Sequence, residues 1–593
     1  MQISRIRIQN FRCFKELDIG LEKLTILIGE NNVGKTNLLA AIDKVIGLGR
    51  TYFEENDFYK PTESFDPRTS DPIIIEIELS PPDGCTTFSK EEDAIFGNEY
   101  FLRKDGSIRL VIRAKHWYDD GDEEFKTELN FIKDNVAYGT FTSRHRKGLC
   151  FCLIGAIRNI ERDVIGRRGL FSRLLDAVNL TQFTETTLEG LCQQINQVIS
   201  SDPSISDFQK GLKDTISKII PLKDDPNSVA FNPVPLNPQD VLKNAGIFLH
   251  IEGQPTSQPV VAQGAGSQSI LVLSIFEAYI KKLGFTSPIL GVEEPESHLH
   301  PHAQRYIFRY LVSKSDQVLI STHSTFVTDQ ADPFAIRLLR RVGEKITAKS
   351  IPRILKGKPY LNDKEKEKLK RTLNAEGSEL FFAHSVILVE GPSEKVAYPI
   401  LAKAQNIDFD RNGISVLPYE SDDFHIFGRI LNKNGLDIPF VVQMDGEEAT
   451  IKKAARRLIT LGVILEKDFH AQKEDTDSIV DNLLIPNNIF PLRKKGHGFN
   501  FETYMLSVPK GVEFYMEAIS EIYGQDKLDQ YLQSRSDLDP DSMAESEKVL
   551  EFIGSKQASK PTLAQYVATK CAEQRIIPRL FKRVIEVAVK LSA

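Results

Sequence analysis

Residues 24–42 read LTILIGENNVGKTNLLAAI, and this stretch predicts the fold of the first part of the chain. An apolar run, Leu24–Ile28, leads into the segment Gly29–Thr36, which fits the phosphate-loop pattern G-x-x-x-x-G-K-[ST] in full. The spacing of apolar residues after the loop predicts a helix. A strand, a glycine-rich loop and a helix in this order are typical of an α/β domain that binds a nucleotide.

The residue types in the loop suit ATP with a magnesium ion. Glycines such as Gly29 and Gly34 let backbone N–H groups wrap phosphate oxygens. We expect Lys35 to reach the β and γ phosphates and the Thr36 hydroxyl to bind Mg²⁺. The asparagines of the same stretch belong to the predicted nucleotide site: Asn31, Asn32 and Asn37.

A second segment with nucleotide chemistry reads ILGVEEPE, residues 289–296. Apolar residues that end in paired acids predict a buried strand that delivers carboxylates to a metal ion and a water molecule. We expect Glu293 to help hold Mg²⁺ and Glu294 to polarise the attacking water.

Two further segments complete the pattern by resemblance. VLISTHS (318–324) predicts a strand that leads to His323, and QGAGSQS (263–269) precedes a predicted helix. With the phosphate loop and the paired acids, these segments resemble the SMC, RecF and OLD group of ABC-type ATPases. The resemblance implies that His323 senses the γ-phosphate and that Ser267 contacts ATP bound to a partner subunit. We therefore expect a homodimer or a higher homo-oligomer.

A second site is predicted near the middle of the chain. SVILVEGPSE (385–394) and IPFVVQMDGE (438–447) both read as strands that end in acids, at Glu390 and Asp445. Acids at the carboxyl ends of two parallel strands can converge on one metal ion. The sequence therefore predicts a second metal site, separate from the phosphate loop.

These two segments look like a Toprim domain, and ELFFAH (379–384) is similar to the segment before that domain in OLD proteins. The resemblance assigns Glu390, Glu394 and Asp445 to the metal site. Glu447 stands where the family usually has Asp, which adds one methylene to this ligand. The resemblance further implies that Glu502 is an additional acid and that Lys560 stabilises charge on a scissile phosphate.

The expected fold class is α/β: an ABC-type ATPase domain with a helical insertion for dimerisation, followed by a Toprim-like α/β domain. No long heptad array separates the halves of the ATPase, which argues against an SMC-like arm. The predicted segments are 1–160 (ATPase, first part), 161–243 (helical insertion), 244–350 (ATPase, second part), 351–380 (linker) and 381–593 (Toprim).

The order of the two modules points to an OLD-family nuclease: an ATP-binding endonuclease that uses Mg²⁺ or Mn²⁺ to nick or cleave DNA. The resemblance implies a role in anti-phage defence and admits a helicase-like partner protein. The alternative is a RecF/SMC-like DNA-binding ATPase with a non-catalytic Toprim domain, which the altered Glu447 would favour.

Composition limits these hypotheses only weakly. The net charge of −7 does not indicate a nucleic-acid binder, but a local basic cluster can exist in an acidic protein. The cluster closest to Glu502 is Arg493, Lys494, Lys495 and His497, which we expect to contact DNA phosphates. The six cysteines form no CxxC pair, which argues against a zinc site. Without a signal-peptide pattern or a membrane-length apolar run, a cytoplasmic protein is expected.

Overall fold

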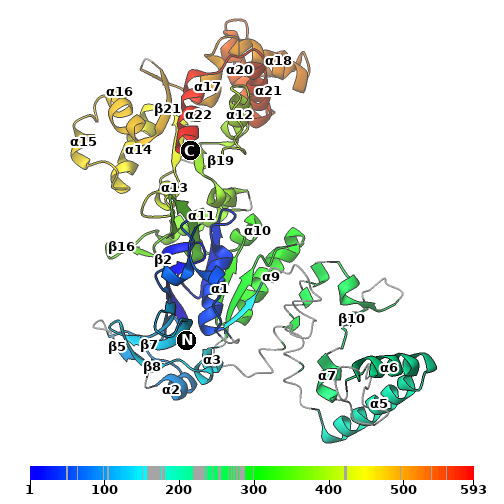
Figure 1. Ribbon diagram of the computed structural model, residues 1–593. Helices are drawn as coiled ribbons and strands as arrows, with labels where there is room; N and C mark the ends of the chain where they lie inside the picture. Colours follow the sequence, from blue (N-terminus) through cyan, green and yellow to red (C-terminus); the bar gives the residue numbers. More distant parts are fainter. Residues whose placement is uncertain are drawn as a thin grey trace. The chain divides into compact units, whose positions relative to one another are not determined.

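A computed structural model shows the chain as two compact units (Figure 1). One unit comprises Met1–Thr25 and Thr36–Thr322, and the other Ile26–Lys35 and His323–Ala593. The residues that the structure describes are 1–47, 51–62, 64–97, 99–102, 106–149, 151–155, 175, 180–217, 234–235, 237–243, 245–250, 256–264, 266–268, 270–271, 274–275, 278, 288–297, 299–374, 376–419, 424–494, 496–535, 537–555 and 557–592.

The first unit contains an antiparallel sheet (blue and cyan in Figure 1). Within the described residues its strand order is β2-β1-β4-β6-β7-β8, and β5 pairs with β6. Alternate residues of β6, such as Ile108, Leu110 and Ile112, are buried, as expected for a sheet with one face on the core. The strands are β1 (Gln2–Phe11), β2 (Phe14–Gly20), β4 (Ile73–Ser80), β5 (Phe101–Leu102), β6 (Ile108–Asp119), β7 (Glu124–Lys133) and β8 (Val136–Thr140).

The paired acids lie at the end of the middle one of three parallel strands in the first unit. β12 (Ile289–Glu293) lies between β9 (Phe151–Ile154) and β13 (Gln317–Ser321). The buried amide of Gln317 ties these strands to the antiparallel sheet. It accepts from the N–H of Ile3 at 2.7 Å and donates to the carbonyl oxygens of Ile3 at 2.8 Å and Glu22 at 3.0 Å.

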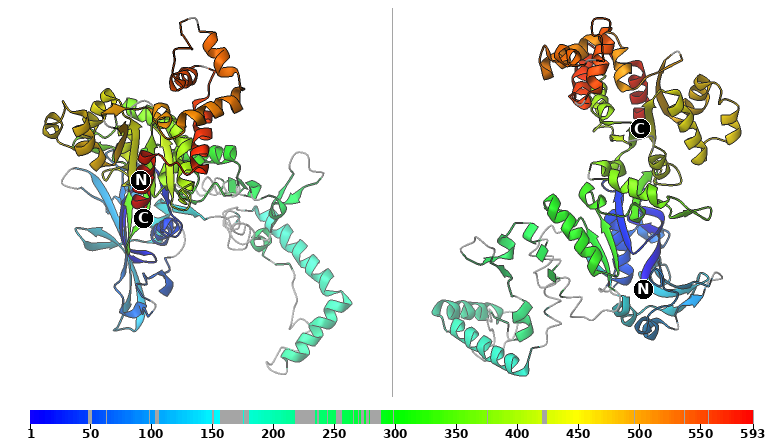
Figure 2. Two further views of the ribbon diagram at one scale, coloured as in Figure 1. Left: turned by 90° about the horizontal axis from the view of Figure 1, so that it is seen from above. Right: turned by 180° about the vertical axis from the view of Figure 1, so that it is seen from behind.

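The helices of the first unit include a contacting pair, α5 (Gln182–Ser200) and α6 (Pro203–Ile216) (Figure 2). This pair falls within the predicted helical insertion, of which residues 161–174, 176–179, 218–233 and 236 lie outside the described residues. Cys150 lies outside them too. The other helices are α1 (Lys35–Ile46), α2 (Lys90–Phe96), α3 (Ser143–Leu149), α7 (Pro238–Lys243) and α9 (Pro301–Lys314), and the short strands are β10 (Phe248–Leu249) and β11 (Gln258–Pro259).

The phosphate loop groups with the second unit. Its strand β3 (Leu24–Gly29) pairs in parallel with β14 (Ile336–Val342), with Gly29 opposite Leu339. β15 (Lys345–Lys349) pairs antiparallel with β14. The predicted linker, 351–380, contains β16 (Ile354–Leu355), β17 (Lys358–Pro359) and the helix α11 (Asp363–Thr372). Asn362 and Glu365 cap α11 reciprocally, which explains why the helix begins there.

A second, mostly parallel sheet carries the Toprim-like segments. Its order is β19-β18-β20-β21-β22, and only β22 pairs antiparallel. The strands predicted before Glu390 and through Asp445 are confirmed. Because β18 and β20 are parallel neighbours, these two acids lie at the same edge of the sheet. The strands are β18 (Ser385–Val389), β19 (Ile414–Pro418), β20 (Phe440–Asp445), β21 (Ile489–Lys494) and β22 (His497–Gly498).

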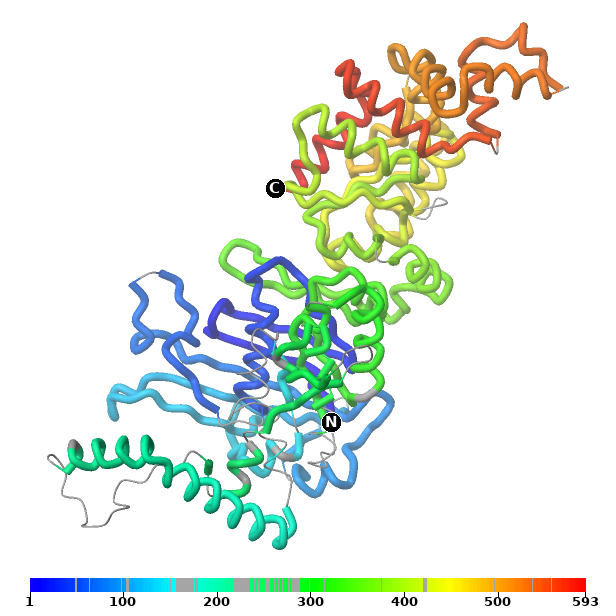
Figure 3. The backbone as a smooth tube through the Cα atoms, turned by 90° about the vertical axis from the view of Figure 1, so that its right-hand side faces the viewer, coloured from blue at the N-terminus to red at the C-terminus, as the bar shows by residue number. Residues whose placement is uncertain are grey.

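Helices pack on this sheet (Figure 3), and side chains between them form one large apolar core. The last helix, α22, contacts β18, β19, β20 and β21, and α12 packs on α21. The rings of Tyr398 and Phe581 lie 4.8 Å apart in this core. The helices are α10 (Thr325–Thr328), α12 (Pro392–Lys403), α13 (Phe424–Leu431), α14 (Glu448–Thr460), α15 (Glu466–His470), α16 (Thr476–Ile479), α17 (Phe501–Leu506), α18 (Gly511–Tyr523), α19 (Lys527–Gln533), α20 (Glu545–Gly554), α21 (Lys560–Glu573) and α22 (Arg579–Ser592).

Among the described helices, none combines the length and the apolar character that a bilayer-crossing helix needs.

Candidate active sites

The phosphate loop has the backbone conformation that its glycines predict. Gly29, Asn32 and Gly34 all have positive φ, of 144°, 63° and 99°. A Cβ on Gly29 would lie 2.3 Å from the carbonyl oxygen of Leu339, so only glycine fits between the loop and β14. The Lys35 ammonium donates to the carbonyl oxygens of Gly29 and Glu30, each at 2.8 Å. In this conformation the Lys35 ammonium lies against the backbone of its own loop.

The other predicted nucleotide residues of this stretch differ in their surroundings. Asn31, Asn32 and Thr36 are exposed, as ligand-binding groups at a helix start should be. The Asn37 amide instead bonds within the first unit, where it accepts from Arg12 at 3.2 Å and donates to the sulfur of Cys13 at 3.1 Å. The nucleotide contact of Asn37 stays a prediction.

The paired acids lie where the apolar strand β12 ends. Glu293 is its last residue and is in register with Ser321 of β13. Glu294 has a positive φ of 45°, which is uncommon for a residue with a side chain, and its N–H donates to the Ser321 carbonyl at 2.8 Å. Glu296, which the sequence did not single out for a role, accepts from the Thr322 hydroxyl at 2.6 Å. Together these bonds hold the loop that carries both acids against the end of β13.

His323 and the phosphate loop line one cavity of about 250 Å³ in the second unit. Arg340, Phe381 and His384 line it as well, and His384 Nε2 lies 3.2 Å from Glu30 Oε1. The structure thus places His323 beside the loop, as its predicted role requires. Ser267 lies partly buried at a helix start, and nothing in the structure tests its predicted contact with a partner's nucleotide.

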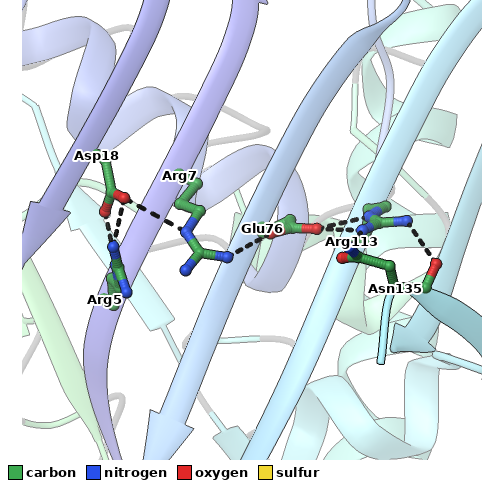
Figure 4. Close-up of polar contacts among 6 residues, drawn as sticks. All are labelled: Arg5, Arg7, Asp18, Glu76, Arg113 and Asn135. Atoms are coloured by element: carbon green, nitrogen blue, oxygen red, sulfur yellow. Dashed lines mark hydrogen bonds and ion pairs between the residues drawn. The ribbon is translucent and has the colours of Figure 1, made fainter. Parts of the chain in front are cut away.

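A larger cavity, of about 630 Å³, lies over the antiparallel sheet of the first unit. Figure 4 shows a charge ladder across these strands, in which Arg5 and Arg7 share Asp18, and Arg7 and Arg113 share Glu76. Because carboxylates oppose these arginines, the surface lacks the excess positive charge that phosphate binding needs. These ion pairs connect neighbouring strands of the sheet.

The Toprim-like acids converge at the edge of the second sheet. The Asp445 N–H donates to Glu390 Oε2 at 3.1 Å, so the ends of β18 and β20 are joined through an acid side chain. Glu394 lies in the first turn of α12, where Pro392 starts the helix, and it is only 4% exposed. Glu447 is exposed and precedes α14 as its N-cap residue.

Electrostatics show how closely these acids are grouped. Burial, together with the charges of Glu390, Glu502 and Glu447, raises the pKa of Asp445 to about 7, and the charge of Lys560 opposes this rise. Burial likewise raises the pKa of Glu394 to about 8, with contributions from Asp445, Glu502 and Glu390. Like charges in a partly buried space disfavour ionisation of each other, and a bound cation removes that penalty.

Glu502 and Lys560 join the group from helices of the C-terminal region. Glu502 lies in the first turn of α17 and is 8% exposed, and Lys560 is the first residue of α21. Lys560 Nζ lies 3.4 Å from Glu502 Oε1, with half of the lysine side chain exposed. The structure therefore brings together all six residues that the resemblance assigned to the second site: Glu390, Glu394, Asp445, Glu447, Glu502 and Lys560.

The donor set fits a divalent cation in chemistry and charge, because carboxylate oxygens are the ligands that Mg²⁺ and Mn²⁺ prefer. Within the described ranges, no three Asp, Glu, His or Cys side chains already stand in an arrangement that could hold a metal ion. Coordination would therefore require changes of side-chain rotamer; Glu447 is exposed, and Glu390 and Asp445 are partly exposed.

Two contacts of this site were missed by the sequence analysis. Arg493, expected to contact DNA, forms an ion pair through Nε with Asp477, and its Nη1 donates to the carbonyl oxygen of Gly446 at 3.3 Å. Lys494 and His497 of the same predicted cluster are exposed, and Lys495 lies outside the described residues. The pairing of Arg493 depends on Asp477 from a distant segment, so no local sequence signal could have indicated it.

Comparisons with known proteins find a match for each of the two parts of the chain. The family model described as "AAA domain, putative AbiEii toxin, Type IV TA system" matches residues 24–329. The model described as "Overcoming lysogenization defect protein-like, TOPRIM domain" matches residues 381–446. The first match contains the phosphate loop, the paired acids and His323, and the second contains Glu390, Glu394 and Asp445.

Three curated relatives match along most of the chain. The "OLD nuclease" of Thermus scotoductus is 27% identical over 76% of this chain and 83% of its own. The "Endonuclease GajA" of Bacillus cereus is 24% identical over 84% of this chain and 83% of its own. The "Old nuclease" of Escherichia phage P2 is 23% identical over 75% of this chain and 77% of its own. Each of these matches extends over more than either family model alone.

Proposed function

Because the chain belongs to the family of AAA-domain ATPases and joins this domain to an OLD-like Toprim domain, we propose that it is an ATP-binding, metal-dependent DNA endonuclease. The observation that carries the proposal is the group of five carboxylates and one lysine at the edge of the Toprim sheet. The names of three relatives that match over most of their length, two "OLD" nucleases and an endonuclease, support the same activity.

The acids of the Toprim site would hold one or two Mg²⁺ or Mn²⁺ ions, with Glu390, Asp445 and Glu447 as the more exposed ligands and Glu394 as a buried one. Such ions lower the pKa of a bound water and neutralise charge on a leaving oxygen. Lys560 is held by Glu502 but is half exposed, so its ammonium can also reach the oxygens of a scissile phosphate. DNA is the substrate that we propose.

The ATPase site would work through the residues assigned from the sequence. Lys35 and the loop N–H groups bind the phosphates, and Thr36 and Glu293 hold Mg²⁺. Glu294 orients the attacking water, and His323 contacts the γ-phosphate. Ser267 would contact ATP bound to the other protomer of a dimer.

Exposed apolar side chains support the proposal that the helical insertion mediates dimerisation. Phe183 and Val198 of α5 are 82% and 73% exposed, and Phe208 of α6 is 55% exposed. Apolar side chains exposed to this degree on one helix pair are typical of a surface that another chain covers.

The nuclease proposal is tested with supercoiled plasmid, incubated with Mg²⁺ or Mn²⁺ and with or without ATP. We expect the wild type to nick or cleave the plasmid and Glu390→Ala to lose this activity. Glu513→Gln, which removes an exposed carboxylate on α18 of the same region, is the matched control and should cut like the wild type.

The outcomes separate the alternatives. A wild type that binds DNA but cuts under no condition would favour the RecF/SMC-like ATPase with a non-catalytic Toprim domain. Cutting by Glu390→Ala at the wild-type rate would refute the site assignment. We further propose a role in anti-phage defence, together with a helicase-like partner. Loss of phage resistance in a plaque assay with Glu390→Ala would support the defence role.

A further inference from the structure

The residues Asp445, Gly446 and Glu447 form a short segment between β20 and α14, here named the acidic loop. β21 runs parallel to β20 with Leu492 opposite Asp445, so the next residue of β21, Arg493, emerges beside Gly446. Arg493 Nη1 donates to the Gly446 carbonyl oxygen at 3.3 Å, and its side chain is only 12% exposed. The guanidinium thus contacts the peptide that separates the two proposed metal ligands.

Asp477 holds Arg493 in this position. Its carboxylate pairs with Arg493 Nε, while Nη1 remains directed at the acidic loop. Asp477 itself lies in the first turn of α16, whose N-cap residue Asp475 accepts from the Asp477 N–H at 3.0 Å. The π-helical turn Val480–Leu484 follows directly. Because two groups on different segments bind one planar guanidinium, its orientation is determined.

The other side of the acidic loop is held by backbone contacts. The Gly446 N–H donates to the Phe499 carbonyl at 2.8 Å, and the Phe499 N–H donates to the Leu492 carbonyl at 2.8 Å. A Cβ on Gly498 would lie 2.1 Å from the Gly446 carbonyl oxygen, so the two backbones approach as closely as glycines permit. The carbonyl that Arg493 binds is therefore pressed against the β21–β22 hairpin.

We infer that Arg493 is a positioning residue: with Asp477 it fixes the Gly446 peptide, and through it the directions from which Asp445 and Glu447 approach a divalent cation. The inference rests on the proposed function and deepens it. Ligands held by outer hydrogen bonds need less ordering when they bind a metal ion, and the loss of such partners weakens metal affinity. The positive charge of Arg493 also lies beside a loop whose acids repel each other.

The competing role for Arg493 is a contact with a DNA phosphate. Two of its donor nitrogens are already engaged with protein groups. Lys494, the next residue, is exposed and suits a phosphate contact better. Lys494→Gln is therefore the matched control, because it removes a neighbouring positive charge from the same strand without touching the acidic loop.

The first experiment measures the affinity of the nucleotide-free protein for Mn²⁺ by electron paramagnetic resonance. Glu390→Ala, which lacks a ligand of the Toprim site, shows how much Mn²⁺ binds elsewhere. We expect Arg493→Gln to weaken Mn²⁺ binding by about 10- to 100-fold, the usual cost of losing a group that orients metal ligands. Arg493→Lys keeps the charge but cannot bind both partners at once, so it should give an intermediate affinity. Lys494→Gln should bind Mn²⁺ like the wild type.

The second measurement is plasmid nicking as a function of Mn²⁺ and of DNA. Arg493→Gln should shift the Mn²⁺ activation curve to higher Mn²⁺ concentration and leave the KM for plasmid unchanged. Lys494→Gln should leave the Mn²⁺ activation curve unchanged and raise the KM for plasmid. Unchanged Mn²⁺ affinity in Arg493→Gln, or a raised KM for plasmid alone, would overturn the inference. If Arg493→Gln does not fold, the Mn²⁺ affinities of Arg493→Lys and Asp477→Asn test the inference instead. Wild-type Mn²⁺ affinity in both variants would overturn the inference. A wild type that cuts no DNA refutes the proposed function, while Mn²⁺ binding still tests Arg493.

Discussion

The close approach of Gly446 to the neighbouring strand makes Gly446→Ala a sharp test of how the acidic loop is built. A Cβ on Gly446 would lie 1.9 Å from the carbonyl oxygen of Leu492 and 2.5 Å from its carbon. These are backbone atoms of β21, so no side-chain rotation can relieve the clash. The acidic loop and β21 must move apart.

The size of the movement follows from the contact distances. Real Cβ atoms essentially never approach another heavy atom within 3.0 Å, so the separation must open by about 1 Å. Since Asp445 and Glu447 flank Gly446, a shift of this size misplaces both proposed ligands. A misplacement of about 1 Å can cost about 100-fold in rate, and we expect a loss of that order in plasmid nicking.

The assay is the initial rate of plasmid nicking at saturating Mn²⁺, with ATP binding measured in parallel. Gly554→Ala is the control, because a Cβ there meets no atom within 4 Å. Gly498→Ala should give a similar loss through a different contact, because a Cβ there would lie 2.1 Å from the carbonyl oxygen of Gly446. Nicking by folded Gly446→Ala within about threefold of the wild-type rate would refute the argument that this approach sets the ligand geometry.

Three other predictions concern separate features. Lys560→Ala should lower the nicking rate by about 100- to 1,000-fold, because it removes one group that stabilises charge in the transition state. ATP binding should stay unchanged, and an equal loss of ATP binding would contradict the prediction. Removal of divalent ions with EDTA should abolish plasmid nicking. Addition of Mn²⁺ should restore the activity of the wild-type protein, whereas Glu390→Ala should stay inactive. Gln317→Leu leaves polar groups of Ile3 and Glu22 without their buried partner, and should destabilise the first unit by about 3 kcal/mol, seen as an earlier urea transition; an unchanged midpoint would show that water replaces these bonds.

Local sequence patterns predicted the strands and loops that carry both sites. The phosphate loop between a strand and a helix and the acids at the ends of β12, β18 and β20 all lie where their patterns indicated. These features depend on neighbouring residues: an apolar run buries a strand, and glycine or proline sets the turn after it.

The surroundings of individual residues could not be predicted in the same way. The sequence suggested a phosphate contact for Arg493, whereas the structure engages it with Asp477 and Gly446. Glu296 attracted no assignment of a role, yet it binds Thr322 across two strands. Neither pairing leaves a trace in local periodicity, because the partners are separated by 16 and 26 residues.

Local sequence patterns predicted the order of the two modules and, through the family resemblance, the residues that each module would use. The resemblance assigned Glu502 and Lys560 to the second site, but only the packed chain brings them to the acids of β18 and β20, where burial and mutual repulsion raise the pKa values of Asp445 and Glu394. The same packing brings Arg493 into contact with Asp477 and with the acidic loop. The physical reason is that burial, electrostatic repulsion and backbone approach are properties of distances in space, and distances between remote residues are set only when the sheet and its covering helices pack.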